Sequence, residues 1–101
     1  MMNQIILVGR LVKDPREERD GTLTLAVPRS YKNADGVYET DFVPCRIWGN
    51  MAETTMEYCR KGDIVGVKGR LQSTNGMIEV VAEKVTFLSS KSSNNNERDD
   101  D

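Results

Sequence analysis

The spacing of apolar residues predicts three strands in the first half of the chain. Residues 4–13 form a β-rich apolar run with few polar interruptions. Residues 22–32 and 39–49 each alternate apolar and polar positions with a period of two. The turn sequence NADG at 33–36 lies between these two runs, so we expect them to form a β-hairpin.

Proline at position 28 interrupts the second of these strands. Because proline has no amide hydrogen to donate to a sheet, Pro28 marks an edge, a bulge or the end of the strand. A bulge would reverse the alternation and let Arg29 and Tyr31 face outward. The sequence leaves this point open.

After the hairpin, the apolar spacing changes to that of a helix. Residues 51–61 repeat apolar or small side chains at intervals of three and four, namely Ala52, Thr55, Met56 and Cys59. We expect Asn50 to cap this helix, with Glu53 as its capping-box partner. Gly62 is expected to end it in the left-handed conformation.

Two further strands complete the pattern. Residues 63–72 alternate, with Val67 and Leu71 on the apolar face. Asn75-Gly76 predicts a tight turn, and residues 77–88 form the last strand. Both strands therefore belong to a second hairpin.

The order of elements predicts an all-β fold with one helix. A single helix between the third and fourth of five strands is the layout of a five-stranded OB-fold barrel. We assign residues 1–88 to this domain. Residues 89–101 are polar and low in complexity, and we expect them to form a disordered acidic tail.

The stretch DFVPCRIWGN, residues 41–50, places large aromatics on the side of the third strand that should meet water. Its inner positions are Val43, Cys45 and Ile47, and its outer positions include Phe42, Arg46 and Trp48. Exposed rings beside a cation stack on unpaired bases, and OB-folds commonly bind oligonucleotides across their second and third strands. The alternatives are aromatics that cap the barrel or pack under the helix, and a patch that docks a protein.

Other residues near this face are candidates for the same role. Tyr31 is either a third stacking residue or an ordinary exposed hairpin residue. The basic candidates from these patterns are Arg10, Arg29, Lys32, Arg46, Lys68 and Arg70. Taken singly, Arg10, Lys13, Lys68 and Arg70 are explained better by a solvated strand face that discourages edge pairing.

Composition and charge restrict the classes of function that the chain can have. The net charge is −2, but residues 97–101 carry a net −3 and the rest of the chain, with thirteen bases and twelve acids, a net +1. A nucleic-acid site must therefore come from local placement of charge. The chain has no histidine, which excludes Ser-His-Asp catalysis and Cys/His zinc sites, so we expect no enzyme and no cofactor or metal.

The two cysteines and the length of the apolar runs indicate in which cellular compartment we expect the protein. Cys45 and Cys59 fall on predicted apolar faces and are expected to be buried free thiols in a reducing cytoplasm. No apolar run approaches the length of a membrane span, and the first ten residues do not have the pattern of a signal peptide.

Four segments, in order, resemble the bacterial single-stranded DNA-binding protein family. They are ILVGRLVKDP, DFVPCRIWGNMAE, EYCRKGDIVGVKGRL and EVVAEKVTFL, and the similarity covers about residues 2–88. The resemblance implies an OB-fold that coats single-stranded DNA in replication, recombination and repair, in the bacterial cytoplasm and at the nucleoid. It also implies a homotetramer in which the first strand, QIILVGRL, pairs between subunits.

The resemblance also implies roles for individual residues. The stacking aromatics of the family correspond to Tyr31, Phe42 and Trp48, and the basic residue of its helix-ending RKG motif corresponds to Lys61. With Lys61 added, the expected basic track comprises Arg10, Arg29, Lys32, Arg46, Lys61, Lys68 and Arg70.

The chain departs from the family pattern in two loops and in its tail. The loops after Asp14-Pro15 and around Asn75-Gly76 are short, and the second lacks the stacking aromatic found in many members. We therefore expect a smaller DNA footprint. The acidic end lacks the hydrophobic tip through which the family recruits replication and repair proteins. Either the tail was cut, or this recruitment is reduced or different; the equal alternative is a disordered end that only aids solubility. The alternatives are a dimeric primosomal-type OB-fold protein and an OB-fold interaction module that binds no nucleic acid.

Overall fold

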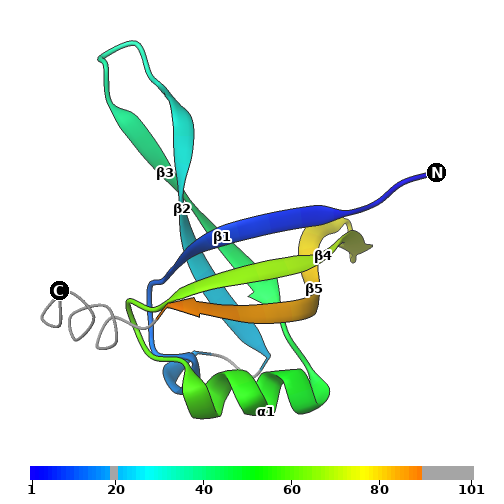
Figure 1. The fold of residues 1–101 in the computed structure, drawn as a ribbon. Coiled ribbons are helices and arrows are strands. Elements are labelled where there is room, and N and C mark those ends of the chain that lie inside the picture. Colours follow the sequence, from blue (N-terminus) through cyan, green and yellow to red (C-terminus); the bar gives the residue numbers. More distant parts are fainter. Residues whose placement is uncertain (19–20, 90–101) are drawn as a thin grey trace, which may run out of the picture.

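Five strands close into a barrel in the order β1-β2-β3-β5-β4 in the computed structural model of the protein, which describes residues 1–18 and 21–89 (Figure 1). The elements are β1 (Ile5–Leu11), the short 3-10 helix η1 (Pro15–Glu17), β2 (Thr22–Lys32), β3 (Tyr38–Arg46), α1 (Gly49–Tyr58), β4 (Ile64–Thr74) and β5 (Met77–Ser89). Neighbouring strands are antiparallel except β3 and β5, which are parallel. This architecture confirms the predicted OB-fold barrel.

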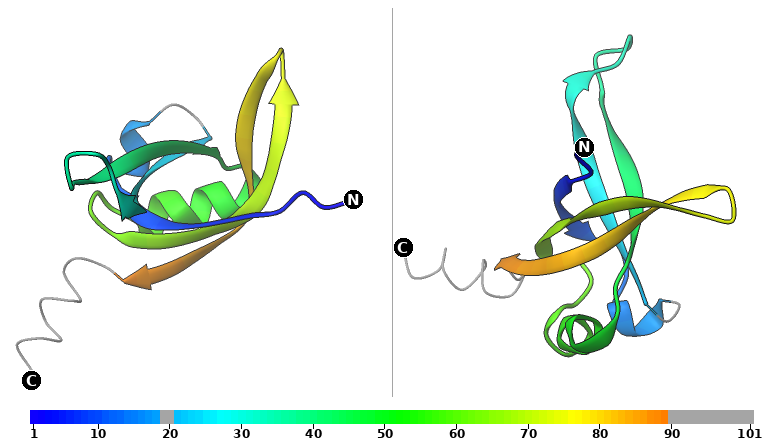
Figure 2. Two further views of the ribbon diagram at one scale, coloured as in Figure 1. Left: turned by 90° about the horizontal axis from the view of Figure 1, so that it is seen from above. Right: turned by 90° about the vertical axis from the view of Figure 1, so that its right-hand side faces the viewer.

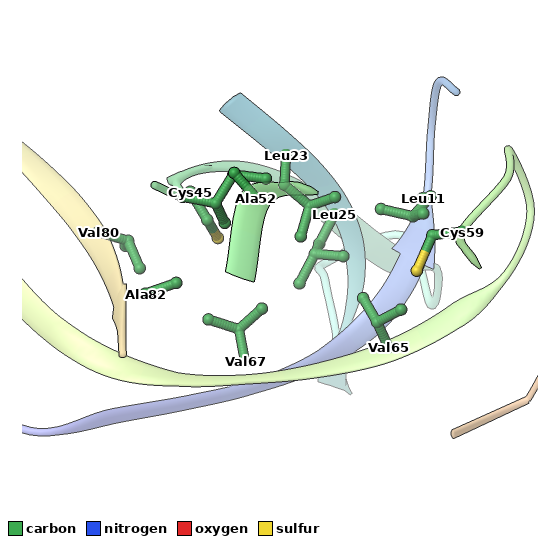
Figure 3. Packing of buried hydrophobic residues seen from close by; sticks show 11 residues of the cluster. Leu11, Leu23, Leu25, Cys45, Ala52, Cys59, Val65, Val67, Val80 and Ala82 are labelled. Carbon is green, nitrogen blue, oxygen red and sulfur yellow. The ribbon is translucent and has the colours of Figure 1, made fainter. Parts of the chain in front are cut away.

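The barrel encloses the residues that the alternation placed inside. Leu23 and Leu25 of β2 and Cys45 of β3 are fully buried, and they meet Val65 and Val67 of β4 (Figure 3). Burying an aliphatic side chain of this size stabilises the fold by roughly 1.5–3 kcal/mol. The apolar face of each strand therefore fixes its register on the barrel.

Helix α1 closes one end of the barrel (Figure 1). Its buried face carries Ala52 and Thr55, and Cys59 follows directly after the helix, also buried. Burial raises the pKa of the Cys45 and Cys59 thiols to about 11, so both stay protonated at neutral pH, and both are free cysteines as expected.

The predicted start and end of the helix are wrong. The N-cap residue is Trp48 and makes no side-chain capping bond, so Asn50 and Glu53 form no capping box. The carbonyl of Trp48 already accepts the amide hydrogen of Ala52, which starts the helix before Asn50. At the other end the helix stops at Tyr58, and Gly62, at φ +92°, lies instead in the turn that leads to β4.

Two long hairpins extend beyond the barrel and leave it in different directions (Figure 2). In the β2–β3 turn, the Asn33 side-chain oxygen accepts the amide hydrogens of Asp35 and Val37 at 2.8 and 3.0 Å. In the β4–β5 turn, Asn75 and Gly76 both have positive φ, as a type I′ turn requires.

The expectation that Leu71 faces the core is wrong. Leu71 has the same alternation as Val65 and Val67, but it is exposed. The reason is that β4 continues to Thr74, into the part of the hairpin that extends beyond the core. The apolar alternation predicted the face correctly but not the point at which the strand leaves the barrel.

Of the three possibilities that Pro28 left open, β2 has the bulge, but the bulge does not reverse the alternation. Pro28 lies opposite Thr40 and Lys32 lies opposite Tyr38, so four residue steps on β2 span two on β3. Because the excess is an even number of residues, Pro28 and Lys32 keep the same face. Arg29 accordingly donates to Asp41 and Glu39, which alternate along β3 with Phe42 and so lie on the other face of the strand. The outward orientation considered for Arg29 is therefore wrong.

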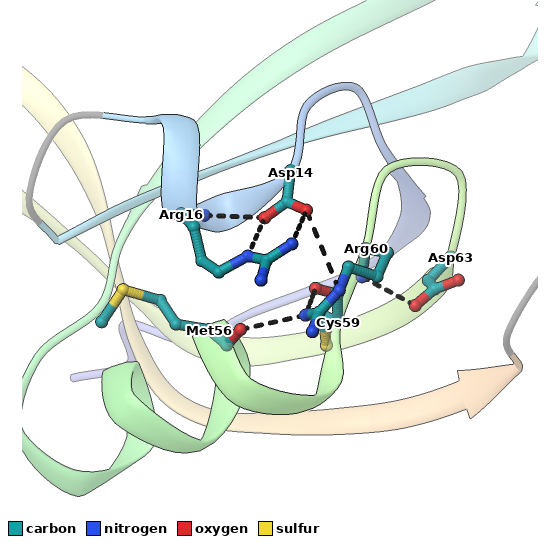
Figure 4. A network of polar contacts seen from close by, with 6 residues as sticks. All are labelled: Asp14, Arg16, Met56, Cys59, Arg60 and Asp63. Carbon is teal, nitrogen blue, oxygen red and sulfur yellow. Dashed lines mark hydrogen bonds and ion pairs between the residues drawn. The ribbon is translucent and has the colours of Figure 1, made fainter.

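A polar network fastens the β1–η1 loop to the end of α1 (Figure 4). The amide and guanidinium of Arg16 donate to Asp14 at 2.8–3.0 Å, and Arg60 approaches the same carboxylate at 3.9 Å. The side-chain bond from Arg16, aided by the backbone bond, lowers the pKa of Asp14 to about 2. The amide of Arg60 donates in turn to Asp63 at 2.9 Å, so two loops are held by one set of ionised groups.

Within residues 1–18 and 21–89, no helix is long and apolar enough to cross a membrane, and no cluster of histidine, cysteine or acidic side chains could hold a metal ion. Apart from Ser89, the last residue of β5, the tail expected at 89–101 lies outside the described residues.

Candidate nucleic-acid interface

Phe42 and Trp48 lie exposed along one continuous run of extended backbone. Their exposed fractions are 65% and 58%, whereas Ile47 between them is 3% exposed. Trp48 follows the end of β3 but keeps an extended conformation, with φ −158° and ψ 164°, so the alternation of the strand continues to it. Ala26 lies opposite Phe42, and its small side chain leaves the ring uncovered. Neither aromatic packs into the barrel end or under the helix, which excludes that alternative.

A groove of about 1020 Å³ opens beside Phe42, which lines it, whereas Trp48 lies outside its lining. Strands β3 and β5 pair only at two positions, Cys45 with Val80 and Arg46 with Val81, and then diverge. The groove lies where they part, between the second half of β3, from Asp41 to Arg46, and the β4–β5 hairpin. Its volume is large enough to hold more than a single side chain or ion, and it is open along the aromatic face.

Two apolar residues on the far wall of this groove were missed by the sequence analysis. Met77 and Ile78 line the groove together with Phe42 and Pro44. Their exposed fractions are 69% and 68%. Their position directly after the turn at Asn75-Gly76 could have indicated that they are exposed, because side chains at the tip of a hairpin cannot reach the core. They supply an apolar surface facing β3 where the sequence offers no aromatic.

Tyr31 is exposed and lies further toward the tip of the β2–β3 hairpin than Phe42. Lys32, its neighbour, is opposite Tyr38, so Tyr31 is three to four residues beyond Phe42 toward the hairpin tip. At 3.3 Å per residue this separation is about 10–13 Å. The candidate stacking residues therefore form a line along the β2–β3 hairpin and not a cluster.

The basic residues of the β2–β3 hairpin are not free cations. Arg29 donates to both oxygens of Asp41 at 2.9 and 3.1 Å, and these hydrogen bonds raise the pKa of Arg29. Arg46 forms an ion pair with Glu79 at 3.0 Å. The ammonium of Lys32 lies 5.7 Å from the centre of the Tyr38 ring, a cation–π distance.

The remaining basic candidates lie on other parts of the barrel. Arg10 donates to the Gly62 carbonyl at 2.9 Å, next to Lys61 in the α1–β4 turn. Lys68 lies opposite Ile6 of β1, and Arg70 forms an ion pair with Glu83 at 3.3 Å. The expected basic track is thus divided between the β2–β3 hairpin and the β1–β4 side.

Comparison with known sequences links this architecture to one family. A family model described as "Single-strand binding protein family" matches residues 2–88. The chain is 44% identical to single-stranded DNA-binding protein B of Bacillus subtilis, an alignment that covers 90% of this chain and 94% of the relative. It is 40% identical to single-stranded DNA-binding protein 3 of Listeria innocua, with 96% and 74% of the two chains covered.

Comparison with solved structures supports the fold. The chain is similar to a crystal structure of a deletion mutant of the single-stranded DNA binding protein from Thermus aquaticus, with a TM-score of 0.67. The alignment covers 89% of this chain and 52% of that one at 23% identity. At this identity the likeness establishes a shared barrel and nothing finer.

Proposed function

Because the chain belongs to the single-strand binding protein family, we propose that it binds single-stranded DNA without sequence preference and protects it during replication, recombination and repair. The observation that supports this most is the exposure of Phe42, which lines the groove, and of Trp48, which follows on the same run of extended backbone. Both the family and these relatives are named for binding, and we propose a binding protein without catalytic activity.

In the proposed binding mode, bases stack on the exposed aromatics and the phosphates contact basic side chains around them. Every base has a π-face, so stacking on Phe42, Trp48 and Tyr31 tolerates any sequence. Met77 and Ile78 would contact bases from the opposite wall of the groove. The basic residues of the β2–β3 hairpin, with Lys61 and the other cations of the β1–β4 side, would neutralise phosphates and make binding weaken as salt rises.

Replacing single aromatics tests this mode. We expect Trp48→Ala and Phe42→Ala each to weaken binding of oligo-dT by about 5- to 150-fold, the equivalent of one stacked base. Affinity is measured by anisotropy of a labelled oligonucleotide, and thermal unfolding checks that each variant is folded. Both side chains are exposed, so their loss leaves no cavity in the core.

Tyr58→Ala is the matched control. Tyr58 is an exposed aromatic on α1 that contacts Phe87, with ring centres 6.4 Å apart, and it does not line the groove. It should bind DNA like the unchanged protein. Normal binding by both Trp48→Ala and Phe42→Ala would show that this face is not the site.

We also propose that the protein is a homotetramer in which β1 strands pair between subunits. Strand β1 meets β2 only at Arg10 and Leu11, so in the described part of the chain its edge from Ile5 to Gly9 has no partner on that side. Ile6 and Val8 are exposed on its outer face, and Leu88 lies beside them. An unpaired strand edge next to apolar side chains favours association. A dimer is the competing assembly.

The setting and further partners are also proposals. We propose that the protein acts in the bacterial cytoplasm at the nucleoid, where single-stranded DNA is exposed. The acidic residues 97–101 would contribute to contacts with replication or repair proteins through their charge. Deleting them and comparing capture of such proteins from a bacterial lysate on single-stranded DNA beads tests this role.

A further inference from the structure

The groove beside the aromatic face carries more negative than positive charge. Its lining includes one cation, Arg46, and two carboxylates, Asp41 and Glu79. A polyanion bound over such a groove meets a local electrostatic penalty. The acidic side chains therefore need an explanation at a DNA-binding face.

Glu79 holds one edge of the Arg46 guanidinium through two contacts. Its Oε2 lies 3.0 Å from Nε and its Oε1 accepts from Nη2 at 3.4 Å. The pair forms across the β3–β5 junction, where Arg46 lies opposite Val81, two residues after Glu79. A phosphate that binds this edge of Arg46 needs the same two donors that the carboxylate occupies.

Arg29 is held in the same way by two carboxylates. Asp41 accepts from its Nε and Nη2 at 3.1 and 2.9 Å, and Glu39 accepts from its Nη1 at 3.1 Å. All three side chains lie on the exposed hairpin and are partly open to solvent. Water and ions can reach these pairs, so an incoming anion can exchange with the carboxylates.

We propose that Glu79 at Arg46, and Asp41 with Glu39 at Arg29, are internal competitors of the DNA phosphates, so that binding is weaker and less salt-dependent than the number of basic residues suggests. This inference rests on the proposed DNA-binding function. When a phosphate displaces a carboxylate from an arginine, the released carboxylate takes up a cation from solution. Fewer counterions are then released in total, and the salt dependence becomes shallower.

Removing one competitor gives the test. Glu79→Gln keeps the size of the side chain and removes its charge, which leaves Arg46 available to phosphate. Oligo-dT binding is measured across a salt series. We expect Glu79→Gln to bind up to about fivefold more tightly at low salt, as for the release of an exposed ion pair. The slope of log affinity against log salt should steepen by about 0.7, one additional phosphate contact on a single strand.

Glu57→Gln is the matched control for net charge. Glu57 is an exposed residue on α1, nine residues beyond Trp48, and it forms no ion pair with another described residue. The two variants change the charge of the protein equally. Of these two variants, only Glu79→Gln should steepen the salt dependence of affinity beyond the small shift that the loss of one charge causes in each. Asp41→Asn should act in the same direction as Glu79→Gln, through Arg29.

A double-mutant cycle shows whether the effect passes through Arg46. In an Arg46→Gln background, Glu79→Gln should lose most of its gain in affinity and slope. Equal affinity and equal salt dependence of Glu79→Gln and Glu57→Gln would overturn the inference, and so would a gain in affinity that persists without Arg46. Neither result would contradict the proposed DNA binding. Absence of oligo-dT binding by the unchanged protein would instead overturn the proposed function and the inference together.

Discussion

At the scale of single residues, the sequence predicted which side chains face water better than it predicted what they touch. A period of two that continues through Ile47 is enough to expose Trp48, because the backbone stays extended beyond β3. The pairing of Arg46 with Glu79 could not be predicted. These residues are 33 positions apart, and they meet only because β3 and β5 pair in one particular register.

Gly69 is a second residue whose role depends on the register. A Cβ atom at this position would lie 2.1 Å from the Val81 carbonyl oxygen, because β4 and β5 approach closely where the register shifts. We expect Gly69→Ala to destabilise the protein by about 1–3 kcal/mol through overpacking. Chemical denaturation followed by circular dichroism measures the change.

Gly66→Ala is the control on the same strand. A Cβ at Gly66 would meet the Leu88 side chain at 3.5 Å, an ordinary contact distance. This variant should unfold close to the unchanged protein. Equal destabilisation of the two variants would mean that general loss of glycine on β4, and not the approach to β5, determines the result.

At the scale of elements, the strands were predictable and their ends were not. The ranges of β2 and β5 follow directly from apolar alternation and turn residues. The helix starts earlier than expected because Gly49, at φ +63°, lets the chain turn immediately after Trp48. Leu71 is exposed because β4 outruns the core, which alternation alone cannot indicate.

The unpaired edge of strand β1 leads to a prediction about the assembly of subunits. If β1 edges pair between subunits, a charge on the outer face of this strand should disrupt the assembly. We expect Val8→Glu to lower the mass in solution from the tetramer to a smaller species, because the carboxylate would be buried at the interface. Sedimentation equilibrium gives the mass of each variant.

Val37→Glu is the matched control for that experiment. Val37 is an exposed valine in the β2–β3 turn, away from β1. Its replacement should leave the mass unchanged. A tetramer that survives Val8→Glu would show that subunits associate through another surface, and a dimeric unchanged protein would favour the competing assembly.

At the scale of the whole molecule, the order of elements was sufficient to predict the barrel. Five strands with one helix between β3 and β4 match the OB-fold layout, and their closure buries the inward-facing apolar side chains of the barrel. The groove was not predictable, because it depends on where β3 and β5 diverge and on the length of the β4–β5 hairpin. The division of the basic residues between two sides of the barrel follows from the strand order, which places β1 beside β4 and β2 beside β3.

The most direct test of the central claim is a titration with oligo-dT followed by the fluorescence of Trp48, the sole tryptophan. The titration is made at about 50 and about 200 mM salt, the range over which phosphate contacts weaken strongly. We expect strong quenching by oligo-dT, a requirement for more DNA at the higher salt, and little response to duplex DNA of equal length. An unchanged signal, with no binding by anisotropy at either salt, would contradict base stacking on this face and favour an interaction module that binds no nucleic acid.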